Sequence, residues 1–278
     1  MRTACFIAVT AIALLGPAHA QRPQRPIKLF NGKDLSGWVG DPARWSVTDG
    51  IITGSADAAD GDAPEQEFSL IYKAGQVDDF ELKLQVRISD GTRAGVFYRG
   101  QVLDSPEPDL AGYRLVIQPQ RNRIGMLDEP GRRGPLVQRG TSARLDPGGQ
   151  RRVLGPVDTS TAIDTTQWNE YSITARGNRL IHKINGVVTC SAVDNDTERR
   201  SLSGVLALQL LATDRAARIE VKDIVLRRYN RSQAAAPPER KARLADKPAL
   251  VPKWIWTRED PQPGEAAYFR RPWKQDKA

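Results

Sequence analysis

The sequence predicts an all-β protein, an antiparallel β-sandwich of the jelly-roll kind with long loops and an extended C-terminal tail. Between residues 28 and 230, apolar side chains recur with period two far more often than with the 3.6-residue period of a helix. Gly, Pro, Asp and Asn separate about ten such runs. Because an alternating strand buries one face, two sheets must pack against each other to form a core.

The first residues have the pattern of a secretory signal. Arg2 precedes an apolar run over 4–15, and the small-residue pattern Ala18-His19-Ala20 predicts cleavage before Gln21. We therefore expect residues 1–20 to be removed and the protein to be exported, to the periplasm or the extracellular space. No later stretch approaches the roughly 20 apolar residues of a membrane helix, so no membrane span is expected.

The domain expected over residues 27–230 begins with five predicted strands. The clearest is Phe80–Ile88, in which Phe80, Leu82, Leu84, Val86 and Ile88 alternate with polar residues and share one face. The others are Ser46–Thr53, Leu70–Tyr72, Gly95–Arg99 and Tyr113–Ile117.

The segment 119–165 is rich in Gly, Pro and Arg, and it predicts long excursions from the sheet with one or two short strands, such as Ile124–Leu127. Beyond it, Asn185-Gly186 predicts a type I′ turn that joins two strands as a hairpin. The strands predicted here are Tyr171–Ala175, Arg179–Ile184, Val187–Cys190, Val205–Leu210 and Ile219–Ile224.

After residue 230 the composition changes to an Ala-Pro and charged stretch, which predicts a linker over 231–252. Residues 253–278 carry two small aromatic patches, Trp254-Ile255-Trp256 and Tyr268-Phe269-Arg270. We expect a tail that docks on the sandwich or a fragment of a further domain.

The formal charge of +8 is concentrated in this tail and in residues 121–156. No helix with a basic stripe and no nucleic-acid-reading module accompanies it, so no nucleic-acid partner is expected.

The sequence favours no metal or organic cofactor. Cys190 is the only cysteine after the signal and predicts a small buried hydrophobe, while His182 predicts a surface or strand-packing residue. Together they lack the ligand set of a zinc site. A structural Ca²⁺ is the alternative at a loop whose carboxylates are Asp57, Asp60, Asp62 and Glu65, although their spacing fits solvated charges better.

Motifs spread over residues 29–229 resemble the 3-keto-disaccharide hydrolase family. They begin with Leu29-Phe30-Asn31-Gly32-Lys33-Asp34-Leu35-Ser36-Gly37-Trp38 and continue with Gly95-Val96-Phe97-Tyr98-Arg99, Ala111-Gly112-Tyr113, Leu127-Asp128-Glu129, Trp168-Asn169-Glu170 and Gly204-Val205-Leu206-Ala207-Leu208-Gln209. The resemblance implies a concanavalin A-like lectin/glucanase sandwich whose concave sheet receives a carbohydrate, an oxidised glycoside. Many of these residues also suit turns and packing, such as Trp168-Asn169 at the start of a strand.

The resemblance also implies a chemistry. A ketone at sugar carbon 3 acidifies the proton on carbon 2, so one base can start elimination of the aglycone from carbon 1, and water adds afterwards. We expect Glu129 or Asp128 as the base, Arg99 and Arg132 at the enolate or the sugar hydroxyls, and Gln209 as a positioning donor. Because Tyr113, Leu115 and Ile117 share one strand face, Arg114 and Gln118 should face the concave side. The alternative is that Asp128, Glu129 and Arg132 cap a turn and pair with one another.

Three departures from the family pattern favour other readings. Arg93-Ala94 stands where relatives have Asn-Ser, Arg114 and Val116 follow the Gly-Tyr motif where polar or acidic groups are common, and Leu211 replaces a histidine. Three hypotheses therefore stay open: a glycoside hydrolase or lyase, a non-catalytic carbohydrate-binding module, and an interaction domain of a larger cell-surface assembly.

Overall fold

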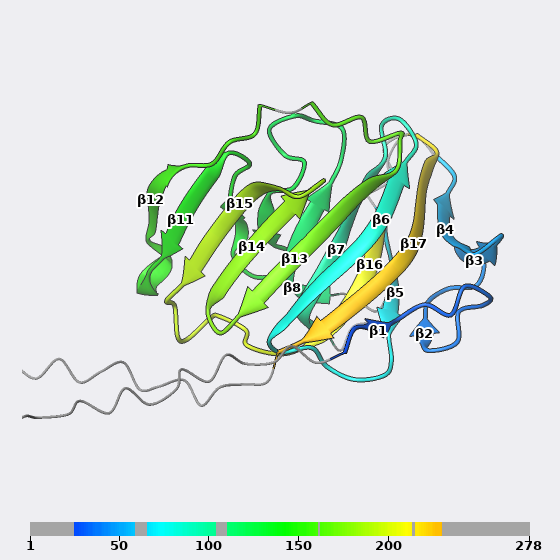
Figure 1. Ribbon diagram of the computed structural model, residues 1–278, viewed down its shortest axis with the longest axis horizontal. Coiled ribbons are helices and arrows are strands. Elements are labelled where there is room, and N and C mark those ends of the chain that lie inside the picture. Colours follow the sequence, from blue (N-terminus) through cyan, green and yellow to red (C-terminus); the bar gives the residue numbers. More distant parts are fainter. Residues whose placement is uncertain (1–24, 59–65, 104–109, 161, 213–214, 230–278) are drawn as a thin grey trace, which may run out of the picture. The chain divides into compact units, whose positions relative to one another are not determined.

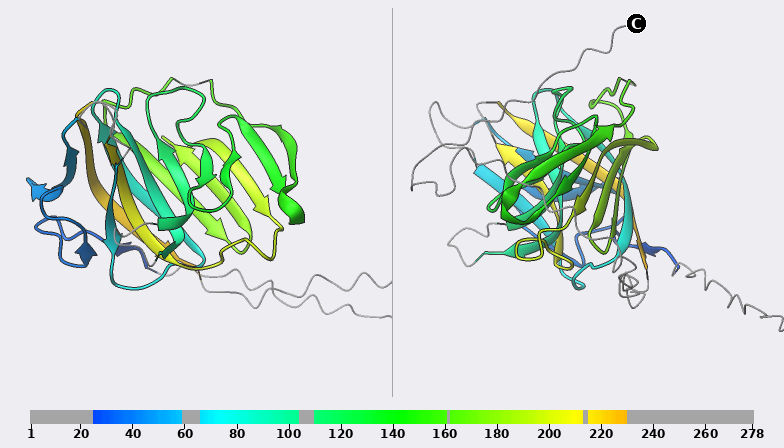
Figure 2. Two further views of the ribbon diagram at one scale, coloured as in Figure 1. Left: turned by 180° about the vertical axis from the view of Figure 1, so that it is seen from behind. Right: turned by 90° about the vertical axis from the view of Figure 1, so that its left-hand side faces the viewer.

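The computed structural model describes residues 25–58, 66–103, 110–160, 162–212 and 215–229. These residues form two β-sheets, one of ten strands and one of seven. Figure 1 looks onto the larger sheet, and the end-on view in Figure 2 shows the two sheets as separate layers. The predicted all-β sandwich is confirmed. The predicted signal, linker and tail, residues 1–20, 231–252 and 253–278, lie outside the described residues.

The ten-stranded sheet runs in the order β12-β11-β15-β14-β13-β6-β17-β4-β3, and β1 pairs with β17. Its strands are β1 (Ile27–Lys28), β3 (Trp45–Thr48), β4 (Ile51–Ala56), β6 (Phe80–Ile88), β11 (Thr141–Leu145), β12 (Arg151–Pro156), β13 (Asn169–Arg176), β14 (Arg179–Ile184), β15 (Val187–Asp194) and β17 (Ala217–Arg228). Strands β11 and β15 run parallel, whereas the other described strand pairs are antiparallel.

The seven-stranded sheet runs in the order β10-β9-β8-β7-β16-β5-β2. Its strands are β2 (Trp38–Val39), β5 (Gln66–Tyr72), β7 (Arg93–Val102), β8 (Leu110–Ile117), β9 (Leu127–Glu129), β10 (Gly134–Val137) and β16 (Val205–Ala212). One turn of 3₁₀ helix, η1 (Pro147–Gly149), connects β11 to β12.

The core lies between the sheets and follows the alternation that the sequence predicts. The five apolar residues of β6 are each no more than 3% exposed. Phe80 meets the ring of Tyr98 from the other sheet edge to face, with centroids 6.0 Å apart, and Tyr98 stacks on Tyr113 at 5.6 Å. Such aromatic pairs add about 0.5–1.5 kcal/mol to the gain from burying their area. The Phe80–Tyr98 contact therefore stabilises the packing of one sheet on the other.

The predicted strand Ser46–Thr53 is divided in the structure. Asp49 and Gly50 have φ angles of 52° and 75°, and they turn the chain so that β3 and β4 pair as a hairpin. The Asp-Gly pair carried that turn signal, because both residues tolerate positive φ.

The segment 119–165 holds more regular structure than predicted. Strands β9, β10, β11 and β12 lie in it, and the expected strand at Ile124–Leu127 is replaced by a turn that leads into β9. One of them, β11, pairs with β15, which is distant in the sequence, and local alternation carries no sign of such pairing.

The predicted hairpin at Asn185-Gly186 is confirmed. Both residues have positive φ, 51° and 79°, and Ile184 pairs with Val187 across the turn. Cys190 on the second strand is a buried free thiol, as predicted, and Asn169 begins β13 as the Trp168-Asn169 motif indicated.

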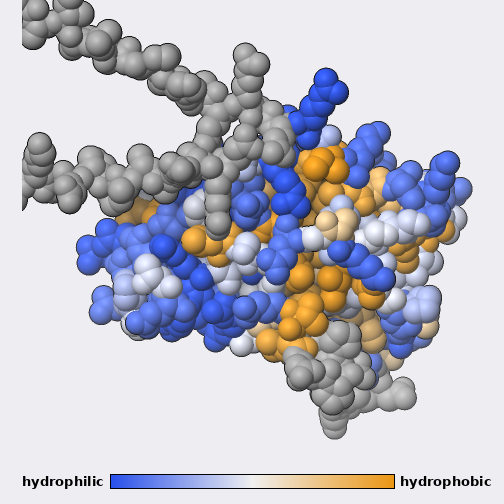
Figure 3. Space-filling view, turned by 90° about the horizontal axis from the view of Figure 1, so that it is seen from below, coloured by the Kyte–Doolittle hydropathy of each residue, from blue (hydrophilic) through white to orange (hydrophobic). Residues whose placement is uncertain are grey.

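The surface of the sandwich carries few large apolar side chains. Figure 3 shows hydrophobic residues gathered in a band between two hydrophilic regions on the face seen from below. The exposed large hydrophobic residues in the described ranges are Ile27, Val39, Val102, Leu103, Val153 and Leu154. No helix in the described part of the chain has the length and hydropathy needed to cross a bilayer.

Candidate functional site

Four polar side chains meet on the face of the seven-stranded sheet that points away from the core. Arg114 lies on β8, opposite Asp128 of β9, and Gln209 and Glu67 come from β16 and β5. Tyr113 and Leu115 point into the core, so the side chain of Arg114 between them must point outward. Arg114 therefore lies on the face opposite to Tyr113 and Leu115, as the alternation predicted, and the concavity of that face stays a prediction.

The four side chains form one continuous chain of hydrogen bonds, which we call the Arg114 group. Arg114 donates from Nε and Nη2 to Asp128 Oδ1 and Oδ2, at 3.0 and 2.8 Å, and from Nη1 to Gln209 Oε1 at 2.5 Å. Gln209 Nε2 donates to Glu67 Oε2 at 2.5 Å. Asp128 and Gln209 thus orient Arg114 from both sides, and such bidentate pairing fixes a guanidinium in its plane.

A glycine makes this arrangement possible. To reach Gln209 on β16, Arg114 of β8 must cross β7, and it does so over Gly95. A Cβ atom at Gly95 would lie 2.7 Å from Arg114 Cδ, closer than two carbon atoms can approach. Phe97, two residues along β7, lies under the guanidinium with its ring centre 5.5 Å from Cζ. In the sequence Gly95-Val96-Phe97, the glycine therefore leaves room for the Arg114 side chain to cross β7, and the Phe97 ring packs against its guanidinium.

Exposure differs sharply along the Arg114 group. The side chain of Glu67 is 36% exposed, that of Arg114 12% and that of Asp128 7%, while Gln209 is fully buried. Val116 and Leu211 are buried beside them on the same sheet face. A ligand approaching from solvent would therefore meet the Glu67 carboxylate and the outer edge of the Arg114 guanidinium first.

Glu129 follows Asp128 in β9 but points the opposite way. Its carboxylate is fully buried and pairs with Arg133, and Arg132 Nη1 lies 3.4 Å from Glu129 Oε1. Burial raises the pKa of the Glu129 carboxyl, and the hydrogen bond and charge of Arg133 and the charge of Arg132 oppose that rise. The two predicted base candidates therefore lie on opposite faces of one strand.

The network around Glu129 continues into the sandwich. Arg133 Nη2 donates to Asp194 Oδ2 at 2.6 Å, and the Tyr113 hydroxyl donates to the same oxygen at 2.5 Å. Arg132, 25% exposed, also donates to Ser201 Oγ at 2.8 Å. In the alternative interpretation Asp128, Glu129 and Arg132 pair with one another: Glu129 and Arg132 do so, whereas Asp128 pairs with Arg114.

Arg99 lies elsewhere and has structural partners. It is 1% exposed, its φ angle is 51°, and it donates to the carbonyl oxygens of Asp78 and Gly177 at 2.9 and 2.7 Å. Its Nη2 also pairs with Asp79 Oδ1 at 3.0 Å. Arg99 thus fastens the bulged end of β7 to two loops, and the structure does not bring it to the Arg114 group.

Gln118, the other predicted sugar-binding residue, follows the end of β8 and is 4% exposed. Of the predicted site residues, the structure brings together Arg114, Asp128 and Gln209. Sequence reasoning missed Glu67, because the strand was expected to begin at Leu70, and it missed Arg133 and Asp194. Strand alternation puts Glu67 on the same face as Ser69, but only the pairing of β5 with β16 shows that this face is shared with Gln209.

The described residues hold no cluster of three or more His, Cys, Asp or Glu side chains placed to bind a metal. Asp57 of the possible calcium loop is fully exposed and lies 3.7 Å from Arg44. Asp60, Asp62 and Glu65 lie outside the described residues, so the calcium alternative stays a prediction.

Part of the sequence is similar to that of a known protein. One curated relative, the 3-keto-disaccharide hydrolase of Bacteroides thetaiotaomicron, is 33% identical over 92 residues, which cover 30% of this chain and 30% of the relative. The match thus spans under a third of that relative's length.

Among solved structures, a protein of Parabacteroides distasonis provisionally named a glycosyl hydrolase aligns with a TM-score of 0.50 and 18% identity, over 73% of this chain and 99% of that one. A carbohydrate-binding module, CBM66 of Bacillus subtilis, aligns with a TM-score of 0.44 and 15% identity, over 68% and 93%. The first similarity supports the sandwich fold.

The profile of the family described as 3-keto-alpha-glucoside-1,2-lyase-like domain matches residues 25–227, which include nearly all of the described sandwich. The expected resemblance is thereby confirmed. The chain belongs to the 3-keto-alpha-glucoside-1,2-lyase-like domain family.

Proposed function

We propose that the protein cleaves a 3-keto-glycoside by elimination at the Arg114 group. The observation that supports this most is the juxtaposition of an accessible carboxylate, Glu67, with an oriented guanidinium, Arg114, whose Nη1 lies 3.9 Å from Glu67 Oε1. Elimination next to a ketone needs one base and one donor for the enolate oxygen. No paired-carboxylate displacement is required, in contrast to ordinary glycosidases.

The reaction divides between two residues. Glu67 takes the proton from sugar carbon 2, and the electron pair of that C–H bond moves toward the carbon 3 ketone to form an enolate. When the enolate collapses, the C1–O bond breaks and the aglycone leaves as an alcohol after taking a proton from solvent. Water then adds across the new C1–C2 double bond, which gives net hydrolysis.

Arg114 stabilises the enolate oxygen in this proposal. A guanidinium has five N–H donors, and Arg114 uses three of them on Asp128 and Gln209. Two donors are left for the ligand. Asp128 and Gln209 are positioning residues that hold the guanidinium plane fixed while negative charge develops.

We assign the base role to Glu67 rather than to Asp128 because both oxygens of Asp128 accept hydrogen bonds from Arg114. The Asp128 carboxylate is 7% exposed and both of its oxygens face Arg114, so it is less accessible to a sugar than the Glu67 carboxylate, which is 36% exposed. Glu129 lies on the other face of β9, so we give it no part in this step.

The experiment is to incubate the purified protein with p-nitrophenyl 3-keto-β-glucoside and to follow p-nitrophenolate release. Glu67→Gln should lower kcat by roughly 10²-fold or more, the usual contribution of a positioned base. Glu170→Gln is the matched control, because Glu170 is also 37% exposed and ion-paired, with Lys83, but lies on the ten-stranded sheet. Equal rates for Glu67→Gln and the parent protein would refute the base assignment.

A second function is favoured by one observation. The charge of Arg114 is matched by Asp128, and its neighbours Val116 and Leu211 are apolar, an arrangement that suits sugar binding without chemistry. If the parent protein releases no aglycone but binds oligosaccharides in calorimetry, and Arg114→Met abolishes that binding, the protein is a carbohydrate-binding module.

A further inference from the structure

A hollow whose lining includes no member of the Arg114 group lies next to β10, β11 and β12. It has a volume of about 600 Å³, and its wall comes from β10, β11, η1, β12 and the loop after β15. Its lining residues are Arg132, Arg133, Pro135, Leu136, Leu145, Asp146, Gly149, Gln150, Arg151, Asp196 and Arg199. This volume is within the usual range for small-ligand sites, about 300–1,000 Å³.

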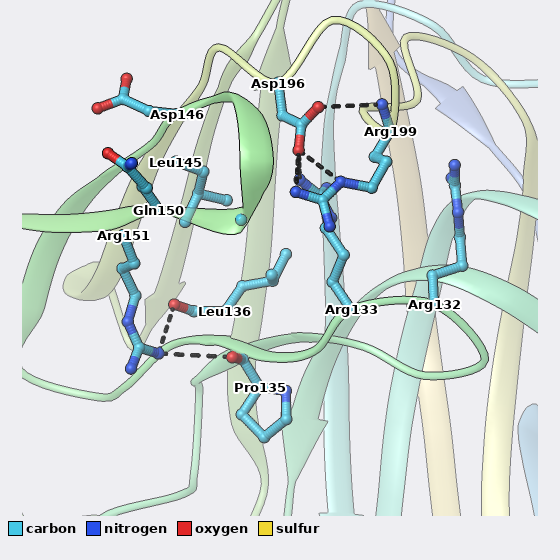
Figure 4. A pocket seen from close by; sticks show the side chains of 11 residues that line it. Arg132, Arg133, Pro135, Leu136, Leu145, Asp146, Gln150, Arg151, Asp196 and Arg199 are labelled. Atoms are coloured by element: carbon cyan, nitrogen blue, oxygen red, sulfur yellow. Dashed lines mark hydrogen bonds and ion pairs between the residues drawn. The ribbon is translucent and has the colours of Figure 1, made fainter. Parts of the chain in front are cut away.

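The arginines on one side of the hollow are held rigidly. Figure 4 shows Arg133 and Arg199 meeting at Asp196 on that side. Arg199 Nε donates to Asp196 Oδ2 at 2.6 Å, and Arg133 Nη1 lies 3.8 Å from the same oxygen. Arg133 is also fixed from behind by Glu129 and Asp194. A preorganised guanidinium loses little entropy when it binds a ligand.

Arg151 stands on the opposite side of the hollow and has a different environment. Its Nη1 donates to the backbone carbonyl oxygens of Leu136 and Pro135, at 3.1 and 3.4 Å. Within the described ranges it makes no ion pair. Figure 4 shows it near Pro135 and across the hollow from Arg133.

The charges around the hollow leave one positive charge unmatched. Asp146, which lines it, pairs with Arg144 at 2.9 Å, and Asp196 pairs with Arg199. When Glu129 and Asp194, which lie behind the lining residues, are included, four of the five arginines have an acidic partner each and the fifth has none. The arginines are Arg132, Arg133, Arg144, Arg199 and Arg151, and the carboxylates are Glu129, Asp194, Asp146 and Asp196.

Two apolar side chains form part of the lining of the hollow. Leu136 and Leu145 are buried, with 6% and 4% exposure, and both contribute to the lining. Gly149 has a φ of 81°, and a Cβ atom there would approach Arg199 Nη2 to 3.2 Å. Apolar side chains beside fixed hydrogen-bond donors suit a sugar ring, whose C–H face packs on aliphatic groups.

We propose that this hollow binds an acidic sugar, a uronate with a single carboxylate. The carboxylate pairs with Arg151, whose charge it neutralises, and the ring lies on Leu136 and Leu145 with its hydroxyls toward Arg133 and Asp196. Carboxylates suit guanidinium groups because two parallel N–H donors match two oxygens. The inference concerns a different surface from the Arg114 group and does not rest on the proposed catalytic function.

The test is titration of the full chain with D-glucuronate, followed by calorimetry or by NMR shifts. We expect a dissociation constant on the order of 1 mM, typical of a small ligand with few contacts. Arg151→Gln should weaken binding about 10-fold or more, since a charge-assisted hydrogen bond is lost. Arg152→Gln is the matched control: it removes the same charge from the next residue of β12, whose side chain points to the other face of the strand.

Two probes separate a uronate site from a general anion site. Glucose should bind at least 10-fold more weakly than glucuronate, because it lacks the carboxylate. Inorganic sulfate that bound as tightly as glucuronate would overturn the proposal, since the sugar ring would then contribute nothing. Equal affinities of Arg151→Gln and Arg152→Gln for glucuronate, or no binding by the parent protein at 20-fold above the expected constant, roughly 20 mM, would also overturn it.

Discussion

Acid should destabilise this protein through one buried histidine. His182 lies on β14 and is fully buried between the sheets. Its Nε2 is 2.9 Å from the Tyr98 hydroxyl, and its Nδ1 is 3.4 Å from the carbonyl oxygen of Gly125 and 3.6 Å from Cys190 Sγ. Burial lowers the pKa of the imidazole from 6.5 to about 4, and backbone contacts at Gly125 and Met126 oppose that change.

The sign and size of the effect follow from this pKa. Between pH 6.5 and about 4, the unfolded chain binds a proton on His182 that the folded chain does not bind. The free energy of unfolding therefore falls as the pH falls through this window. At about 1.4 kcal/mol for each pH unit, the loss reaches about 3 kcal/mol at pH 4.

The assay is urea unfolding of the parent protein and of His182→Gln between pH 7 and pH 4. Glutamine cannot be protonated and can still hydrogen-bond to Tyr98, so the variant should lose about 3 kcal/mol less than the parent protein across this range. The sequence has one other histidine, His19, which is the same in both proteins and cancels in the comparison. Parallel pH curves for the two proteins would refute the reasoning.

Two further substitutions test how the β7 bulge is held. Arg99→Met should lower the free energy of unfolding by about 3–5 kcal/mol, because it breaks the ion pair with Asp79 and removes the Arg99 donors from the carbonyl oxygens of Asp78 and Gly177; a loss under about 1 kcal/mol in urea unfolding would contradict the structural role. Gly204→Ala should cost about 1–3 kcal/mol or more, because its Cβ would lie 2.3 Å from Gly100 O. Gly155→Ala is the control, with no heavy atom within 4 Å of its Cβ, and melting curves that shifted equally for both variants would argue against the close approach.

Strand positions and faces could be predicted where the alternation was long. The five inward residues of β6 and the Asn185-Gly186 hairpin were correct, because period two and turn residues are local properties of the chain. The segment 119–165 was underestimated because its strands are short and one of them, β11, pairs with the distant strand β15, and pairing of that kind depends on the packed fold.

In the Arg114 group, too, some residues could be predicted from local sequence and others depend on the packed fold. Arg114, Asp128 and Gln209 could be proposed from motifs and strand parity, and the structure brings them together. Glu67 could not be found without the pairing of β5 with β16, which brings its side chain to Gln209 from 142 residues away in the sequence. Asp128 and Glu129 looked like equivalent base candidates, but a strand sends consecutive side chains to opposite faces.

By itself, the sequence determined the all-β class, because apolar residues at every second position give each sheet one apolar face and no helical segment is available to cover it, so another sheet must. Only the tertiary structure decided which charges meet. Arg99 ends one family motif and Arg114 directly follows another, yet one is enclosed by carbonyl oxygens and the other reaches outward across Gly95. Burial and partners in space set the role of a charged group, and neither is a property of the residue's position in the sequence.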